Sequence, residues 1–121
     1  MMPIVARPGQ LGALTLDGAM EDYLAIAGPT WRNEIDAAVG MELGSHRPTK
    51  VAKDVVAPIL VQIADVDRSA PPQAAAKAAF AARALVRHYP CDHFDVYDGK
   101  AWHAQVVRHQ VDFLKRIFAD A

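Results

Sequence analysis

Hydrophobic side chains recur every three or four positions in two N-terminal stretches, 15–27 and 30–43, and this spacing predicts two helices. Gly28 and Pro29 separate the two helices, Thr30 is suited to cap the second, and Gly44 ends it. The apolar positions are Leu16, Met20, Tyr23, Leu24 and Ala27 in the first helix and Trp31, Ile35, Ala38, Val39 and Leu43 in the second. We expect residues 1–56 to form a helical segment, with a short helical turn between positions 48 and 56.

The pattern changes at residue 57. A nearly continuous apolar run at 58–64 predicts a strand covered on both faces, and the Ala-rich stretch 73–85 behind two prolines predicts a helix. A second short strand is expected at 86–89 and a last helix at 101–118. The buried side of that helix is expected to carry Trp102, Val106, Phe113, Leu114 and Ile117. Residues 57–121 therefore predict a βαβα unit of the α/β class, with two parallel strands joined by a right-handed crossover.

Composition narrows the class of protein. Hydrophobic residues make up 52% of the chain and charged residues 22%, which is typical of a globular domain. Thirteen Lys and Arg against fourteen Asp and Glu give a net charge of -1, so the sequence favours neither a nucleic acid nor a membrane as partner. One cysteine excludes an internal disulfide, and we find neither a signal peptide nor an apolar run of about 20 residues. We expect a soluble cytoplasmic protein.

Candidate chemistry lies in the two loops that follow the predicted strands, ADVDRSAPP and PCDHFDVYDG. The carboxyl ends of parallel strands meet at one edge of a sheet, where ligands of open α/β sheets bind. Asp67 and His93 are 26 residues apart (93 − 67), which leaves room for one crossover helix between them. We therefore expect their side chains to lie at the same edge.

These loops carry a resemblance to a known family. Asp67-Arg68-Ser69-Ala70-Pro71 matches a D-x-x-x-P pattern, and His93 is followed by the aromatic Phe94. In this respect the chain resembles the C-terminal portion of the α/β-hydrolase superfamily, in particular bacterial serine-hydrolase-like members. The resemblance implies a partial α/β-hydrolase fold in which residues 1–56 are a cap-like segment. It also implies that His93 is the general base and Asp67 the acid that orients it, with Asp65 as the backup acid.

The same resemblance leaves the nucleophile unassigned. The serines are Ser45 and Ser69, and neither stands in a G-x-S-x-G elbow. The implied function is a truncated or degenerate hydrolase-like protein, inactive alone. The alternative is an esterase-like hydrolase for a small ester or amide, whose site is completed by a partner chain or by an activated water. No cofactor is expected.

Other interpretations of the second loop remain open. Cys91, His93 and nearby His88, Asp92 and Asp95 can be read as metal ligands, but a zinc site usually needs four ligands at known spacings, and we expect no metal. We expect Cys91 to be a packed thiol. His93 can instead be a loop histidine bonded to a neighbouring aspartate, and Asp67 can simply cap the following helix. Tyr97 can pack over the loop that carries His93, residues 90–99 (the histidine loop), or line a cleft.

Two strands alone leave open sheet edges, which are sites of aggregation unless a partner covers them. We therefore expect a homodimer, formed by strand pairing or by exchanged elements.

Overall fold

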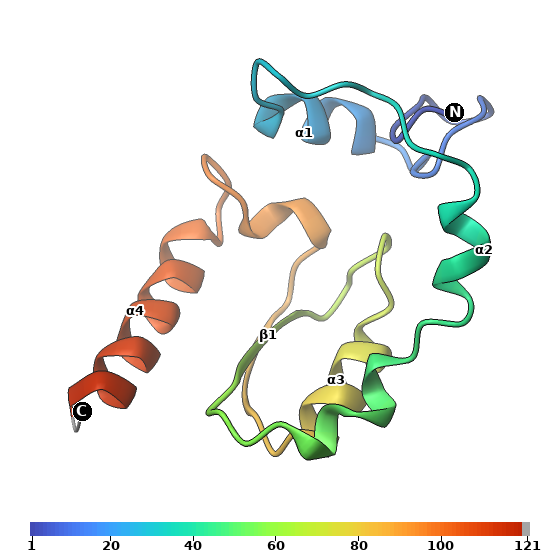
Figure 1. Ribbon diagram of the computed structural model, residues 1–121. Coiled ribbons are helices and arrows are strands. Elements are labelled where there is room, and N and C mark those ends of the chain that lie inside the picture. Colours follow the sequence, from blue (N-terminus) through green and yellow to red (C-terminus); the bar gives the residue numbers. More distant parts are fainter. Residues whose placement is uncertain (120–121) are drawn as a thin grey trace. The chain divides into compact units, whose positions relative to one another are not determined.

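The computed structural model describes residues 1–119, which divide into two compact units (Figure 1). The first unit is Met1–Arg47, and the second begins at Pro48. The division at residue 57 between a cap-like segment and a βαβα part stays a prediction. None of the helices within residues 1–119 combines the length and the apolar character that crossing a bilayer requires.

The first unit contains two short helices, α1 (Ala19–Ile26) and α2 (Val39–Leu43). Helix α1 follows Gly18, whose φ of 81° lies in the left-handed region that glycine adopts without strain. Glu21 and Asp22 lie in its first turn, where negative charge is favourable against the helix dipole. The helix ends just before Gly28, as the sequence predicts.

The second predicted helix, 30–43, is wrong in its first half, because only Val39–Leu43 is helical. Ile35 forms an antiparallel bridge with Met2, with two backbone hydrogen bonds of 2.8 Å. The Asn33 side chain accepts from the Val5 N–H at 2.9 Å and donates to the Val5 carbonyl at 2.8 Å. Val5 is fully buried. The N-terminal segment thus satisfies backbone groups that a helix would otherwise have used.

The second unit has the expected βαβα order, with helical turns before it and inside its last loop. Strands β1 and β2 are parallel and in register from Leu60↔Leu85 to Ala64↔Tyr89. The α/β class with two parallel strands is confirmed. Its elements are the 3₁₀ turns η1 (Pro48–Lys50) and η2 (Ala52–Asp54), strand β1 (Leu60–Ala64), helix α3 (Pro72–Ala81), strand β2 (Leu85–Tyr89), turn η3 (His93–Val96) and helix α4 (His103–Ala119).

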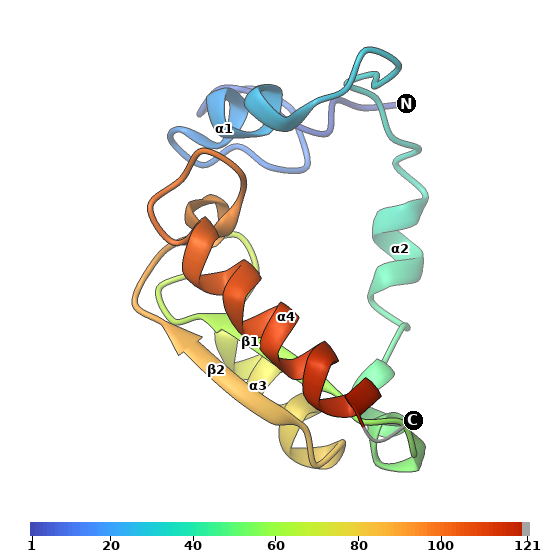
Figure 2. The ribbon, with the colours of Figure 1, turned by 90° about the vertical axis from the view of Figure 1, so that its left-hand side faces the viewer.

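Helices α3 and α4 lie on opposite faces of this small sheet (Figures 1 and 2). Side chains alternate between the faces of a strand, so neighbours along the chain point in opposite directions. Gln62 of β1 donates to the Val106 carbonyl of α4 at 3.0 Å, and Tyr89 of β2 packs with Val106. Ile63, on the other face, is also buried. Both faces of β1 are therefore covered by helix.

A chain of polar contacts connects β1, β2 and α4 within this packing. The Tyr89 hydroxyl is 2.7 Å from Nδ1 of His109 and accepts from Nε2 of Gln62 at 2.8 Å. Gln110 donates to Oε1 of Gln62 at 2.8 Å. Since Tyr89 is fully buried, these contacts supply the partner that its hydroxyl needs.

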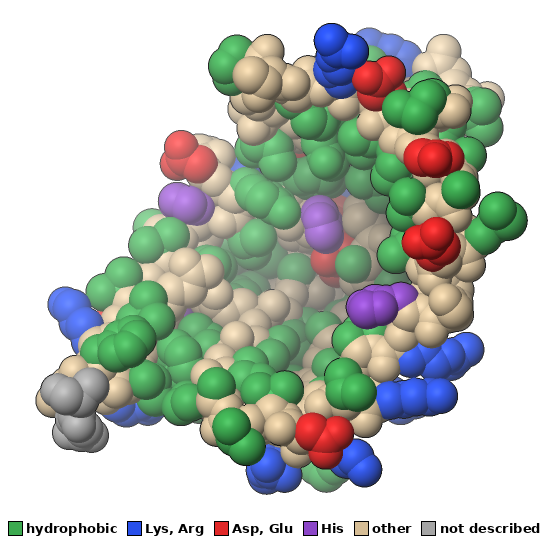
Figure 3. All heavy atoms as spheres, viewed as in Figure 1, with side chains coloured by type: hydrophobic (Ala, Val, Ile, Leu, Met, Phe, Trp, Pro, Cys, Tyr) green, Lys and Arg blue, Asp and Glu red, His purple; other side chains and the backbone are tan. Residues whose placement is uncertain are grey.

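Much apolar surface stays uncovered, and Figure 3 shows hydrophobic side chains across the visible face. Phe80 is 88% exposed and Phe118 67%. Leu114, predicted on the buried side of α4, is 49% exposed, whereas Val106 is buried. Helix α4 is about 25 Å long, but a five-residue strand spans only about 17 Å. The C-terminal part of α4 therefore extends beyond the sheet that would have covered Leu114.

Candidate active site

Backbone pairing continues past the strands and brings the two polar loops together. The N–H of Asp65 donates to the Tyr89 carbonyl at 2.8 Å, and the N–H of Val66 donates to the Cys91 carbonyl at 3.1 Å. Asp67 directly follows Val66, and His93 lies two positions after Cys91. Parallel pairing thus produces the juxtaposition that the sequence suggested.

Asp67 and His93 contact each other directly. Nδ1 of His93 is 2.8 Å from Oδ2 of Asp67, and their side chains are 30% and 12% exposed, respectively. The other carboxylate oxygen, Oδ1, accepts from the N–H groups of Ser69 at 2.8 Å and Ala70 at 2.7 Å. These two bonds fix the carboxylate, so the imidazole is bound by a group that cannot easily rotate away.

The second ring nitrogen of His93, Nε2, faces solvent. Within residues 1–119 it has no hydrogen-bond partner, and no described side-chain N or O atom is both buried and unpaired. The ring is packed edge-on against Phe94 at 4.9 Å between centroids, and Tyr97 lies at 6.2 Å. Tyr97 therefore packs at the histidine loop. With Nδ1 on a carboxylate, Nε2 is the atom that can accept a proton from a bound reactant.

Asp92, directly before His93, links the two loops. Its Oδ1 accepts from the N–H of Arg68 at 2.9 Å and of His93 at 2.8 Å, and its Oδ2 binds the Arg68 guanidinium. Partial burial alone raises the pKa of Asp92. The two N–H groups and the guanidinium outweigh that effect and lower the pKa below its usual value. Asp92 also forms a capping box with Asp95 at the start of η3. The Asp-x-x-Asp spacing is a sequence signal for this cap. The contact between Asp92 and Arg68 has no such signal in the sequence.

Asp65, the backup acid, contacts a different histidine, His88. Its Oδ1 is 2.7 Å from Nδ1 of His88, and the two side chains are 44% and 56% exposed. His88 belongs to β2 and lines a surface hollow with Ala79 and Phe80 of α3. The structure thus contains a second histidine–aspartate pair that the sequence analysis missed.

Cys91 is buried within the cluster that contains Tyr89 and Val106. Burial raises the pKa of the Cys91 thiol, and the carboxylates of Asp95 and Asp65 raise it further. A raised pKa keeps the thiol protonated, which makes it a poor nucleophile and a poor metal ligand. Among residues 1–119, no three His, Cys, Asp or Glu side chains are grouped so as to hold a metal ion.

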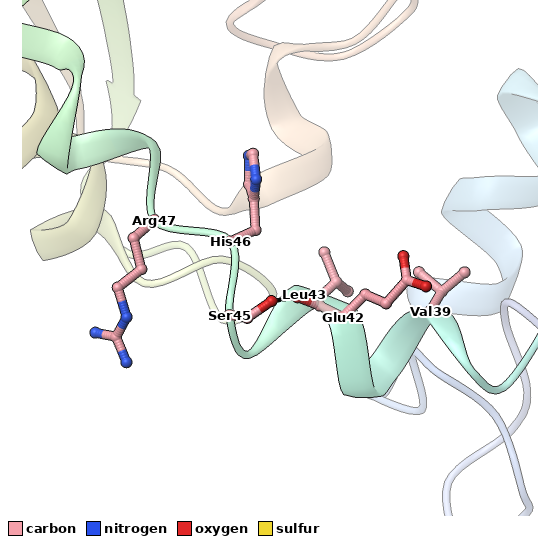
Figure 4. Close-up of a pocket in the computed structure, with 6 residues that line it drawn as sticks. All are labelled: Val39, Glu42, Leu43, Ser45, His46 and Arg47. Carbon is pink, nitrogen blue, oxygen red and sulfur yellow. Dashed lines mark hydrogen bonds between the residues drawn. The ribbon is translucent and has the colours of Figure 1, made fainter.

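Neither serine stands in a G-x-S-x-G elbow. Ser45 donates its hydroxyl to the Glu42 carbonyl at 2.8 Å and follows α2 in the first unit (Figure 4). It lines a surface hollow from which the side chains of His46 and Arg47 point in opposite directions. Ser69 belongs to the loop between β1 and α3 that carries Asp67, which we call the acid loop. Its N–H donates to Asp67. The roles of His93 and Asp67 as base and acid, with no nucleophile in the chain, stay predictions.

This chain is similar to part of a longer protein. No family model matches the chain, and no solved structure matches it. It is 31% identical over 120 residues to quorum-quenching protein AidA of Acinetobacter baumannii (strain MDR-ZJ06). The match covers 97% of this chain and 39% of that protein, so the chain spans well under half of the relative's length.

These comparisons correct the expected membership in the α/β-hydrolase superfamily. Neither a family model nor a solved structure supports it, and the matching relative bears another name. The motif that suggested it has a local explanation. Asp67 accepts the N–H groups of Ser69 and Ala70, and Pro71, the proline of the motif, is the N-cap residue of α3. An aspartate followed by a proline is thus what this strand-to-helix loop needs for its own backbone.

Proposed function

We propose that this chain carries the acid–histidine part of a hydrolytic site, in which Asp67 orients His93 as a general base. The observation that supports this most directly is the contact of His93 Nδ1 with a carboxylate whose other oxygen is held by two N–H groups. That arrangement selects the tautomer with its lone pair on Nε2 and stabilises the imidazolium formed when the base takes a proton.

The nucleophile of the proposed site comes from residues outside this chain, so the chain alone is inactive. Loss of the nucleophile from such a unit costs on the order of 10⁶ in kcat in a well-dissected protease. The relative is much longer than the matched region and has room for further site residues. In the alternative, Nε2 of His93 activates a water molecule directly, which its solvent-facing position favours.

The substrate we propose is a small ester or amide that acts as a signal between cells. The relative's name describes it as quorum-quenching, and the 31% identity is the reason to carry this role over. Hydrolysis of an ester or amide bond is the reaction that a histidine base with an orienting acid serves.

A chimera tests this function. The matching region of the relative is replaced by this chain, and quorum quenching in a reporter strain and hydrolysis of a short-chain p-nitrophenyl ester are measured. We expect His93→Ala to reduce both activities by at least about 10³-fold. His88→Ala removes a histidine from the other aspartate pair and is the matched control, expected to stay within about threefold because surface pairs contribute little. Equal effects of the two variants would contradict the proposal.

The chain alone gives an independent measurement that does not depend on the chimera folding. We expect no ester hydrolysis above background, and no difference between the unmodified chain and His93→Ala. Turnover that disappears in His93→Ala would mean a complete site within this chain, and would favour the activated-water alternative.

We also propose that the outer edges of β1 and β2 pair with further strands, in a homodimer of this chain. Within the described residues each strand pairs with one other strand, and exposed apolar side chains such as Phe80 accompany them. Size-exclusion chromatography with light scattering at micromolar concentration should give twice the mass of the chain, and a monomer would contradict the dimer. A cytoplasmic location stays a prediction.

A further inference from the structure

We propose that Asp92 and Arg68 are positioning residues that hold the loop of Asp67 against the loop of His93, and so set the geometry of the general base. This inference rests on the proposed function, because it concerns the same site. Each residue is adjacent in sequence to one member of the pair: Arg68 follows Asp67 and Asp92 precedes His93. We call the contact between them the loop latch.

The loop latch consists of contacts that cross from one loop to the other. Oδ1 of Asp92 accepts from the backbone N–H of Arg68 at 2.9 Å, and Oδ2 binds the Arg68 guanidinium. The same Oδ1 also accepts from the N–H of His93 at 2.8 Å. One carboxylate thus binds the backbone N–H of the residue after Asp67 and the backbone N–H of His93 itself.

The other hydrogen bonds of the two loops act at different places from the loop latch. The bonds from Ser69 and Ala70 to Asp67 are local to the acid loop and do not reach the histidine loop. The backbone bond from Val66 to Cys91 joins the loops one step closer to the sheet. The loop latch and the His93–Asp67 contact join the two loops farther from the sheet than that bond.

Small changes in such a geometry have large effects, since a displacement of about 1 Å can cost about 10²-fold in rate. A general base also depends on supporting residues that fix its rotamer. At neutral pH Asp92 is ionised and can accept all three contacts, and these same contacts lower its pKa. Arg68 offers a planar guanidinium that fits a carboxylate closely.

The test is NMR spectroscopy of the full chain, following the Nδ1–H proton of His93. A proton shared between an imidazole and a carboxylate gives a downfield signal, and ¹⁵N shifts report which ring nitrogen carries it. We expect Asp92→Ala to lose the downfield signal and to mix the two tautomers. Asp92→Asn keeps an oxygen for both N–H groups and is expected to retain part of the signal. Arg68→Ala is expected to weaken it.

Asp98→Ala is the matched control, since Asp98 belongs to the same loop and its side chain is 96% exposed. It should leave the His93 signal unchanged. Circular dichroism confirms that each variant is folded, and Asp92→Asn serves if Asp92→Ala does not fold. A downfield signal and tautomer that are unchanged in Asp92→Ala, Asp92→Asn and Arg68→Ala would overturn the positioning role.

The same spectra separate this inference from the proposed function. Asp67→Asn should remove the downfield signal, because it removes the charged acceptor. If the unmodified chain shows no such signal, the His93–Asp67 pair is absent in solution and the proposed function fails as well. If Asp67→Asn removes the signal but the Asp92 and Arg68 variants do not, the pair stands and only the loop latch is refuted. In the chimera, Asp92→Ala should lower kcat about 10²-fold with KM little changed.

Discussion

Two histidine–aspartate contacts in the second unit, His93–Asp67 and His88–Asp65, have nearly equal length but different surroundings. His93 and Asp67 are 2.8 Å apart with side chains 30% and 12% exposed, whereas His88 and Asp65 are 2.7 Å apart and 56% and 44% exposed. Asp67 accepts two further N–H groups, while within residues 1–119 the Asp65 side chain accepts only from His88.

A short distance between a histidine and an aspartate does not by itself define a site. An exposed pair exchanges its contact with water at little cost and is screened by salt. The His93–Asp67 pair is held from both sides, by the acid loop around Asp67 and by Asp92 next to His93. The surroundings therefore distinguish a pair that can serve as an oriented base from one that can break and re-form without consequence.

Substitution of Asp67 and of Asp65 should differ most in the loss of kcat. In the chimera, Asp67→Asn should lower kcat for ester hydrolysis about 10⁴-fold, because the amide can donate to Nδ1 and stabilise the wrong tautomer. Asp65→Asn makes the same chemical change on the exposed pair and should stay within about threefold. Equal losses in the two variants would remove the distinction between the pairs.

A smaller effect is expected on the stability of the chain itself. Asp67→Ala leaves its Ser69 and Ala70 donors without an acceptor in a partly buried loop and should reduce the free energy of unfolding by about 2–3 kcal/mol. Asp65→Ala removes an exposed contact and should cost about 0–1 kcal/mol. Urea denaturation at pH 7 measures both. A larger loss for Asp65→Ala would reverse the comparison.

The smallest effect is the pH dependence of the Asp92 contribution. The pKa of Asp92 is lowered in the folded chain, so its contribution to stability is fully present above the ordinary value of 3.8 and is lost as the pH falls through the folded-state value. Asp92→Asn should therefore be less stable than the unmodified chain at pH 7, and the gap should shrink below pH 3.8. Urea denaturation from pH 7 to acid tests this. The Asp98→Asn control should show no such convergence.

Periodicity in the sequence was sufficient to predict the βαβα order. The apolar run at 58–64 and the alanines after Pro72 correspond to β1 and α3 because local propensity and tertiary packing agree there. The residues around Asn33 and Ile35 do not follow their helical spacing, because the partners that override it are Met2 and Val5, about 30 positions away. Contacts of this kind leave no periodic signal.

The site was predictable in part for a similar reason. Parallel strand ends bring Asp67 and His93 to one edge, which follows from topology alone. The sequence named Asp67 as the acid through D-x-x-x-P and kept Asp65 as the backup, but topology alone does not distinguish them, because the partner of each depends on which histidine its carboxylate faces. Arg68 was missed because a basic residue in a loop is usually a solvated surface group. Family membership inferred from D-x-x-x-P failed because a strand-to-helix loop favours those residues for its own hydrogen bonds.

The Tyr89 hydroxyl helps to determine the axial position of α4 against the sheet. Apolar side chains tolerate several axial positions of a helix, but the hydroxyl meets Nδ1 of His109 at one position only. Sliding α4 by one turn, about 5.4 Å, would leave the buried hydroxyl bonded to Gln62 but without His109, a loss of about 1 kcal/mol. The N–H of Trp102 donates to the Asp95 carbonyl at 3.1 Å, so the selected position of the helix also sets the height of the turn that carries His93. The position of α4 that Tyr89 selects thereby contributes to the placement of the turn that carries His93, against which Tyr89 also packs through Val96.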